Sequence, residues 1–168
     1  MKVKKHWLLI ALGIILAFSF AYGLLSPAIR KRRCFPARLV CATNLSVLGK
    51  AIFIYSDENE GEYPAPSIWC DLLIENTDIT AKQFRCYGNE KERCSYAINP
   101  NCEPNSPGDV VLLFETRGGW NQFGGAELLT TENHQGKGCN VLFNDKHVEF
   151  IAPEEIGQLN WGESQANR

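Results

Sequence analysis

No charged residue occurs between residues 7 and 25, which read WLLIALGIILAFSFAYGLL. A helix satisfies its own backbone hydrogen bonds, so a stretch of this composition can bury every side chain in hydrocarbon. At about 1.5 Å of rise per residue, the stretch extends over roughly 28 Å, close to the thickness of the hydrocarbon core of a bilayer. The missing charge therefore predicts a membrane segment at residues 7–25.

The chain also lacks an excess of basic residues in its folded part. Its formal net charge is -2, and the basic side chains concentrate at residues 2–5 and 30–38, which leaves the remainder acidic. A nucleic-acid partner would favour a basic face on the folded domain. The charge distribution thus argues against nucleic-acid binding.

Patterns of catalytic residues are missing as well. The glycine pairs at 118–119 and 124–125 lack the strand-to-helix context and the Lys-Ser/Thr of a phosphate loop. His134, Cys139, Asp145 and His147 fall close together but without regular ligand spacing, so we expect them to hold turns through local hydrogen bonds. The sequence predicts a protein that is not an enzyme and uses no cofactor.

A calcium loop is suggested by Asp57 and Asn59, whose oxygens alternate along residues 57–61. The remaining ligand pattern, including a closing glutamate at the right distance, is absent. A solvated turn is the preferred interpretation, and no metal site is predicted.

Cysteine, in contrast, is abundant, with seven in 168 residues. Such a content in turn-rich sequence favours an oxidising compartment and disulfides. Zinc ligands usually come in pairs two to four residues apart, which these cysteines do not. Cys94 with Cys102, and Cys70 with Cys86, would each close a short loop, although Cys41 or Cys139 could replace any partner. Cys34 is the candidate for the odd, unpaired cysteine.

These observations divide the chain into a basic N-terminus at residues 1–6, an anchor at 7–25, a basic juxtamembrane segment at 26–36, a globular head at 37–161 and a disordered tail at 162–168. The small residues of Ala21-Tyr22-Gly23 would also suit a cleaved signal peptide, but the apolar core exceeds a usual signal sequence. The positive-inside rule would keep the head in the cytoplasm, whereas the cysteines favour export, which we prefer.

The head has an α+β pattern. Residues 37–55 carry an apolar stripe at helical spacing. Pro27 and Pro36 interrupt the helix before it, and a kink is expected at each. A short helix is predicted at 67–75, with Trp69 and Leu73 against the core, and another from Pro153. Strands are predicted at 109–115, 139–143 and 147–151, the last two joined as a hairpin by residues 144–146. This antiparallel sheet should cover the 37–55 helix, and Trp161 should cap the core.

Several of these segments follow one another as they do in a known family. They include Cys41-Ala42-Thr43-Asn44-Leu45, then Tyr55 and Tyr63-Pro64, and later Ser95 to Pro100, His134 and the run from Asn140 to Val148. The chain resembles the bacterial type IV pilin-like and type II secretion pseudopilin-like proteins whose head ends in a His-to-Asp-Gly hairpin. The resemblance implies a pilin-like head and structural roles for Asn44, Tyr55, Pro64, His134, Asn140 and Asp145.

The sequence departs from the family in two places. The processing signal of the family is a glycine followed by Phe-Thr-Leu and a glutamate at the start of the membrane helix. This signal is absent here, so a prepilin peptidase would have no recognisable site. Without that glutamate, incorporation into a filament is not expected. Lys146 replaces the usual glycine of the hairpin, which predicts a different turn type or a left-handed conformation.

The resemblance implies a non-catalytic, membrane-anchored protein of a secretion or surface-assembly system. Its expected partners are the membrane and other pseudopilin-like or envelope proteins. Its expected location is the cell inner membrane, crossed once, with the C-terminal head outside the cytoplasm. The alternative is an exported, membrane-anchored module that binds a metal or an envelope glycan.

Overall fold

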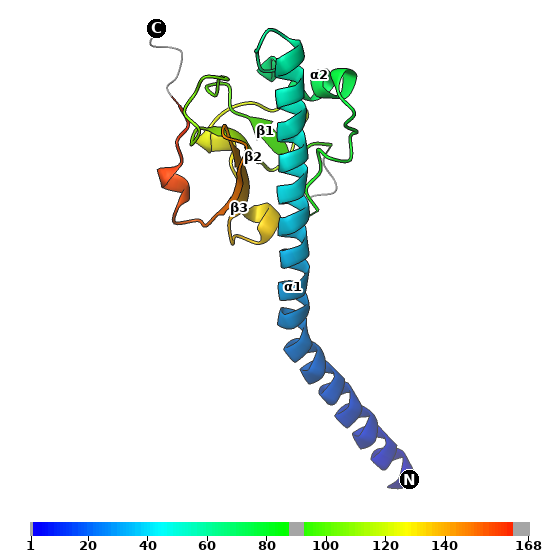
Figure 1. Ribbon diagram of the computed structural model, residues 1–168. Helices are drawn as coiled ribbons and strands as arrows, with labels where there is room; N and C mark the ends of the chain where they lie inside the picture. Colours follow the sequence, from blue (N-terminus) through cyan, green and yellow to red (C-terminus); the bar gives the residue numbers. More distant parts are fainter. Residues whose placement is uncertain (1, 88–92, 163–168) are drawn as a thin grey trace. The chain divides into compact units, whose positions relative to one another are not determined.

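A computed structural model describes residues 2–87 and 93–162, and Figure 1 draws its helices and strands. Within the first helix, side chains are described for Trp7, Ile10, residues 12–20, Tyr22 and from Ala37 onward. Cys34, the side chains of the 26–36 segment and the predicted tail beyond Gly162 thus lie outside the description. The chain forms two compact units, Met1–Phe35 and Pro36–Arg168.

Helix α1 runs from Lys2 to Glu58 without a break in its assignment. The helix assignment thus continues through Pro27 and Pro36, and the kinks expected at these two residues stay a prediction. Proline removes one backbone hydrogen bond and crowds the preceding turn, which weakens a helix locally without obliging it to end. The helix formers on either side of each proline continue the helix.

The C-terminal part of α1 is the core helix of the head. Cys41, Leu45, Leu48 and Ile52 are all 0% exposed, as the spacing predicted, and Tyr55 is half-buried. Among the described residues, the stretch Ala37–Glu58 is long and apolar enough to cross a membrane. Because its apolar stripe packs on the sheet, burial in the head accounts for that composition.

The head contains a four-stranded antiparallel sheet of order β1-β2-β3-β4 (Figure 1). Its strands are β1 (Tyr96–Ile98), β2 (Val111–Glu115), β3 (Cys139–Phe143) and β4 (Val148–Ile151). The three predicted strands are confirmed, with β2 and β4 slightly shortened. Strand β1 was missed because it is only three residues long and lies in turn-rich sequence, where pairing with β2 creates it.

The β3–β4 hairpin closes as predicted. Leu142 pairs with Val148, and the Lys146 N–H donates to the Phe143 carbonyl at 3.0 Å. Lys146 has φ 79°, so the left-handed conformation expected from its replacement of glycine is present. A non-glycine residue in this conformation has a steric cost, so the backbone of the turn is strained at Lys146.

Both faces of the sheet are covered, which explains why every residue of β2 and β3 is buried. One apolar cluster joins Leu45, Leu48 and Ile52 of α1 to Leu112 and Leu142 of the sheet. The other is covered by the chain's later segments, including Leu128, Leu159 and Trp161. Trp161 meets Phe114 edge-on at 4.9 Å between ring centroids, in agreement with the predicted capping role.

Helix α2 and several short 3₁₀ turns belong to the described part of the head. Pro66–Ile68 forms a 3₁₀ turn, η1, that leads into helix α2 (Trp69–Asn76), and both Trp69 and Leu73 are fully buried as expected. The helix predicted from Pro153 is instead a single 3₁₀ turn, η4, at Ile156–Gln158. Gly157 within this turn disfavours an α-helix.

Candidate functional site

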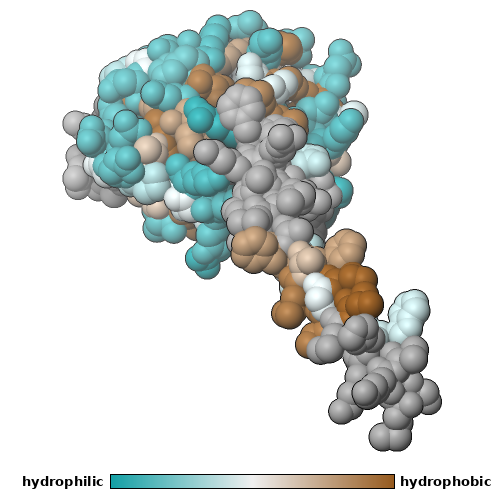
Figure 2. Space-filling model, turned by 90° about the horizontal axis from the view of Figure 1, so that it is seen from below, coloured by the Kyte–Doolittle hydropathy of each residue, from teal (hydrophilic) through white to brown (hydrophobic). Residues whose placement is uncertain are grey.

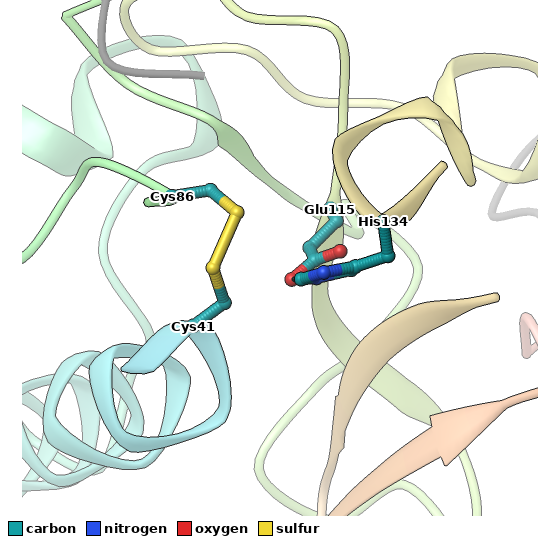
Figure 3. A group of neighbouring side chains, drawn as sticks. All are labelled: Cys41, Cys86, Glu115 and His134. Carbon is teal, nitrogen blue, oxygen red and sulfur yellow. Dashed lines mark hydrogen bonds and ion pairs between the residues drawn. A yellow bond between two sulfur atoms is a disulfide. The ribbon is translucent and has the colours of Figure 1, made fainter. Parts of the chain in front are cut away.

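Four chemically active side chains from distant parts of the sequence meet inside the head (Figure 3). Cys41 comes from α1, Cys86 from the loop after α2, Glu115 from the end of β2, and His134 from the 3₁₀ turn η3 (Glu132–His134). One sulfur, nitrogen or oxygen atom from each lies within 4.8 Å of the others. All four residues are buried with 0% exposure.

Cys41 and Cys86 form a disulfide, with 5.1 Å between their Cα atoms. Of the pairings left open, the one in which Cys41 replaces Cys70 as the partner of Cys86 is formed. The short-loop pairings Cys70 with Cys86 and Cys94 with Cys102 are not, because Cys70, Cys94, Cys102 and Cys139 are free and buried. A disulfide requires Cα atoms about 4.4–6.8 Å apart. Regular spacing along the chain carries no information on that distance. The prediction of at least one disulfide is confirmed.

Glu115, His134 and Asn140 form a buried polar cluster beside the disulfide. Nε2 of His134 lies 2.9 Å from Oε1 of Glu115, and Nδ2 of Asn140 donates to the same oxygen at 2.8 Å. Removing a carboxyl group from water is costly unless such partners replace the lost hydration. Among the described residues, no hydrogen-bond donor reaches the other oxygen, Oε2 of Glu115. Oε2 is therefore still able to accept a hydrogen bond or to bind a cation.

The surrounding elements explain why the cluster is so well enclosed. Asn140 also donates to the backbone carbonyl of Arg38 at 3.3 Å, which ties β3 to α1. The ring of Phe150 on β4 lies 5.6 Å from that of His134 and carries the Arg38 guanidinium at 3.8 Å on its face. Gly138 has φ +139°, and a Cβ there would collide with a β4 carbonyl, so glycine lets β3 begin directly after the histidine turn.

The sequence pointed to His134 and Asn140 but missed Glu115. The role in a local turn that was expected of His134 is wrong, because its Nε2 contacts a carboxyl group 19 residues away. Contacts between side chains so far apart in the sequence depend on how the strands align in the folded sheet. A usable signal was present in residues 109–115, DVVLLFE, because an acidic residue that closes an apolar strand must find a buried partner or leave the core.

Asp145 and His147 lie apart from this site, at the exposed hairpin turn. Asp145 accepts a hydrogen bond from the His147 backbone N–H at 3.2 Å and contacts Nδ1 of the same residue. These bonds hold the pKa of Asp145 below its ordinary value, the side-chain bond contributing most. Local hydrogen bonding, expected for both residues, is confirmed. Cys139 is fully buried, and this burial raises the pKa of its thiol to about 12.

The other singled-out residues have structural positions. Asn44 donates to the Arg85 carbonyl in the loop after α2 at 2.8 Å. Pro64 is buried. The Asn59 amide donates to the Tyr55 carbonyl at 2.7 Å and so caps the end of α1, while Asp57 is exposed. Neither calcium candidate belongs to the cluster of potential metal ligands around Cys41.

Comparison with protein-family models, with curated proteins and with solved structures finds no match for this chain. The pilin-like resemblance thus remains a prediction from sequence motifs.

The chemistry open to the site follows from its enclosure. A substrate cannot approach groups that have no exposed surface, so the site as folded is suited to holding segments together. Thiolate, imidazole and carboxylate are also the ligand types that zinc prefers in proteins. The four residues can therefore hold α1 against the rest of the head through a disulfide and buried hydrogen bonds, or they can act as ligands of an enclosed ion.

Proposed function

We propose that this protein is a membrane-anchored, pilin-like structural protein whose exported head works through contacts with other envelope proteins and has no catalytic role. One observation carries the proposal. The large apolar side chains described in the N-terminal part of α1 are 51–78% exposed, and they are Trp7, Ile10, Leu12, Ile14, Ile15, Leu16, Phe18, Phe20 and Tyr22. Exposed apolar surface on this scale is stable in hydrocarbon and not in water.

The hydropathy of the surface also supports membrane anchoring through the N-terminal part of α1. Figure 2 shows strongly apolar side chains on the described part of the N-terminal helix, whereas the visible face of the head is mostly hydrophilic. The same helix thus has two kinds of apolar stretch. The large apolar side chains described between Trp7 and Tyr22 are exposed, whereas those of the stripe that begins at Cys41 are covered by the sheet.

The buried site supports a structural role for the head. The Cys41–Cys86 disulfide and the Asn140–Arg38 hydrogen bond both fasten α1 close to the start of the globular unit. A head fixed to its helix in this way can transmit force and present a constant surface. The disulfide also favours an oxidising compartment, which agrees with a head outside the cytoplasm and a single crossing of the inner membrane.

Membrane attachment is tested by charge insertion at residues that lie within the exposed apolar stretch. Ile15→Arg together with Leu16→Arg should move the protein from the membrane pellet to the soluble or aggregated fraction, because two arginines at mid-span cost several kcal/mol. Ile15→Ala together with Leu16→Ala is the matched control and should remain in the membrane. Retention of the arginine variant in carbonate-washed membranes would contradict the proposal.

Topology is tested by protease treatment of intact spheroplasts. An exported head should lose its C-terminal epitope, while a cytoplasmic marker stays intact until detergent is added. Peptide mapping after thiol alkylation should find Cys41 and Cys86 blocked until a reductant is present. A protected head would place the domain in the cytoplasm and overturn the proposed location.

A further inference from the structure

The side chains around the disulfide have the composition of a closed zinc site. Structural zinc is held tetrahedrally by four ligands drawn from Cys sulfur, His nitrogen and carboxylate oxygen, at about 2.0–2.3 Å. Tetrahedral ligands at those bond lengths lie about 3.3–3.8 Å from one another. Sγ of Cys41 and Cys86, a Glu115 oxygen and a His134 nitrogen all fall within 4.8 Å, so only small side-chain movements separate them from that arrangement.

We propose that the reduced protein binds one zinc ion at Cys41, Cys86, Glu115 and His134, and that formation of the Cys41–Cys86 disulfide excludes the ion. The same two sulfur atoms serve in both states. The disulfide uses them to bond each other and the metal site uses them as thiolates, so the two states cannot coexist. The inference concerns the head alone and does not depend on membrane anchoring or on export.

The redox step requires a two-electron reductant, either a dithiol or a phosphine, and a phosphine is oxidised with water to its phosphine oxide. The dithiol supplies two electrons and two protons to the Cys41–Cys86 bond and is itself oxidised to a disulfide, which leaves two protein thiols. Zn²⁺ then displaces the two thiol protons into solution. The two charges of the ion replace those of the two displaced protons, so the net charge of the buried site does not change on binding.

The carboxyl group of Glu115 is already oriented for metal binding. Oε2 of Glu115 is buried and receives no hydrogen bond from the described residues, so it offers lone pairs to an ion. Oε1 is fixed by the Asn140 amide at 2.8 Å, which is the kind of outer contact that orients metal ligands. Complete burial of all four ligands also leaves no position for water or substrate, as in structural zinc sites.

A second thiol pair provides an internal control. Burial, and next a hydrogen bond with the thiol of Cys94, raise the pKa of Cys70, so these two thiols are neighbours. They do not belong to the cluster of potential ligands found among the described residues. Cys70→Ser with Cys94→Ser should therefore leave zinc binding unchanged, whereas Cys41→Ser with Cys86→Ser should abolish it.

The experiment uses the full chain in detergent micelles, reduced with a phosphine that does not bind zinc and then exchanged anaerobically against buffered Zn²⁺. Metal analysis should give one zinc per reduced chain and at least a tenfold lower content in the oxidised chain. Co²⁺ in place of Zn²⁺ should give thiolate-to-cobalt charge-transfer absorption and the visible bands of a tetrahedral site. His134→Gln and Glu115→Gln should each weaken retention of the metal at least tenfold.

Two results would overturn the proposal. The first is a reduced wild-type chain without stoichiometric zinc, and the second is equal zinc in the reduced wild type and in the Cys41→Ser, Cys86→Ser variant. Should that variant fail to fold, thermal unfolding of the wild type decides. Zinc should raise the melting temperature of the reduced chain and leave that of the oxidised chain unaffected, whereas equal shifts in both states would contradict a site made from the disulfide sulfurs.

Discussion

The head contains two histidine–carboxylate pairs of similar composition and very different surroundings. His134 and Glu115 are 0% exposed, joined across 19 residues and enclosed by α1 and three strands. His147 and Asp145 are 47% and 51% exposed and lie two residues apart in a hairpin turn. Water competes for the exposed pair and not for the buried one, so the same chemical groups should differ several-fold in their contribution to stability.

The largest expected effect comes from the disulfide beside the buried pair. Cys41→Ala with Cys86→Ala should lower the free energy of unfolding by about 4 kcal/mol, because the bond closes a loop between residues 45 apart in the sequence. Urea unfolding of the full chain in micelles, followed by tryptophan fluorescence, measures the loss. A reductant with a chelator should destabilise the wild type by a similar amount and leave the variant unchanged. An equal response of both proteins would contradict the assignment of this bond.

The next effect compares the two pairs directly through neutral, equally sized replacements. Glu115→Gln should cost about 1.5–3 kcal/mol, because the buried carboxyl group that accepts from Asn140 and contacts His134 is lost. Asp145→Asn, the matched exposed change, should cost less than about 1 kcal/mol. Urea midpoints at neutral pH measure both. Similar losses at the two sites would mean that burial does not distinguish the pairs.

A smaller effect concerns the pH dependence of the exposed pair. The pKa of Asp145 is lowered in the folded head by the hydrogen bonds with His147, so this group stabilises the fold above its ordinary pKa of 3.8. The contribution is lost as the pH falls through the lowered pKa of the folded state. The difference in stability between wild type and Asp145→Asn should therefore shrink from neutral to acidic pH. A difference that grows on acidification would reverse the sign of the assigned shift.

The smallest effect is expected at the turn residue next to that pair. Lys146→Gly should raise the free energy of unfolding by about 0.5 kcal/mol, because glycine adopts the left-handed conformation without a steric cost. Loss of the Lys146 ammonium from the Phe53 ring, 4.4 Å away, offsets part of the gain. Lys146→Asn, which also tolerates this conformation, should be nearly neutral, whereas Lys146→Val should destabilise. A stabilising Lys146→Val would rule out backbone strain as the cause.

The sequence predicted most elements of the head because their signals are local. The stripe through Cys41, Leu45, Leu48 and Ile52 repeats at the period of a helix, and the 139–151 hairpin combines two apolar runs with a short polar turn. Strand β1 could not be found in this way. Three residues carry too short a pattern, and only pairing with β2 gives their backbone groups partners.

The candidate site was predicted less completely. The sequence singled out Cys41, His134 and Asn140, because they lie in segments that follow one another as in the pilin-like family. No local pattern connects these residues to Cys86 or Glu115. Disulfide partners are selected by Cα separation and side-chain direction, which exist only after α1 has packed on the sheet. The buried carboxyl group finds its histidine for the same reason, since β2 and β3 are brought together by pairing across a long connection.

The amino-acid sequence alone thus determined the charge-free stretch at residues 7–25, the amphipathic part of α1, three strands and an abundance of cysteine, because each depends on neighbours along the chain. Tertiary structure decided which cysteines pair, which histidine is buried with a carboxyl group, and that four potential ligands meet at one point. Those outcomes depend on distances between segments that only packing of the helix on the sheet can set.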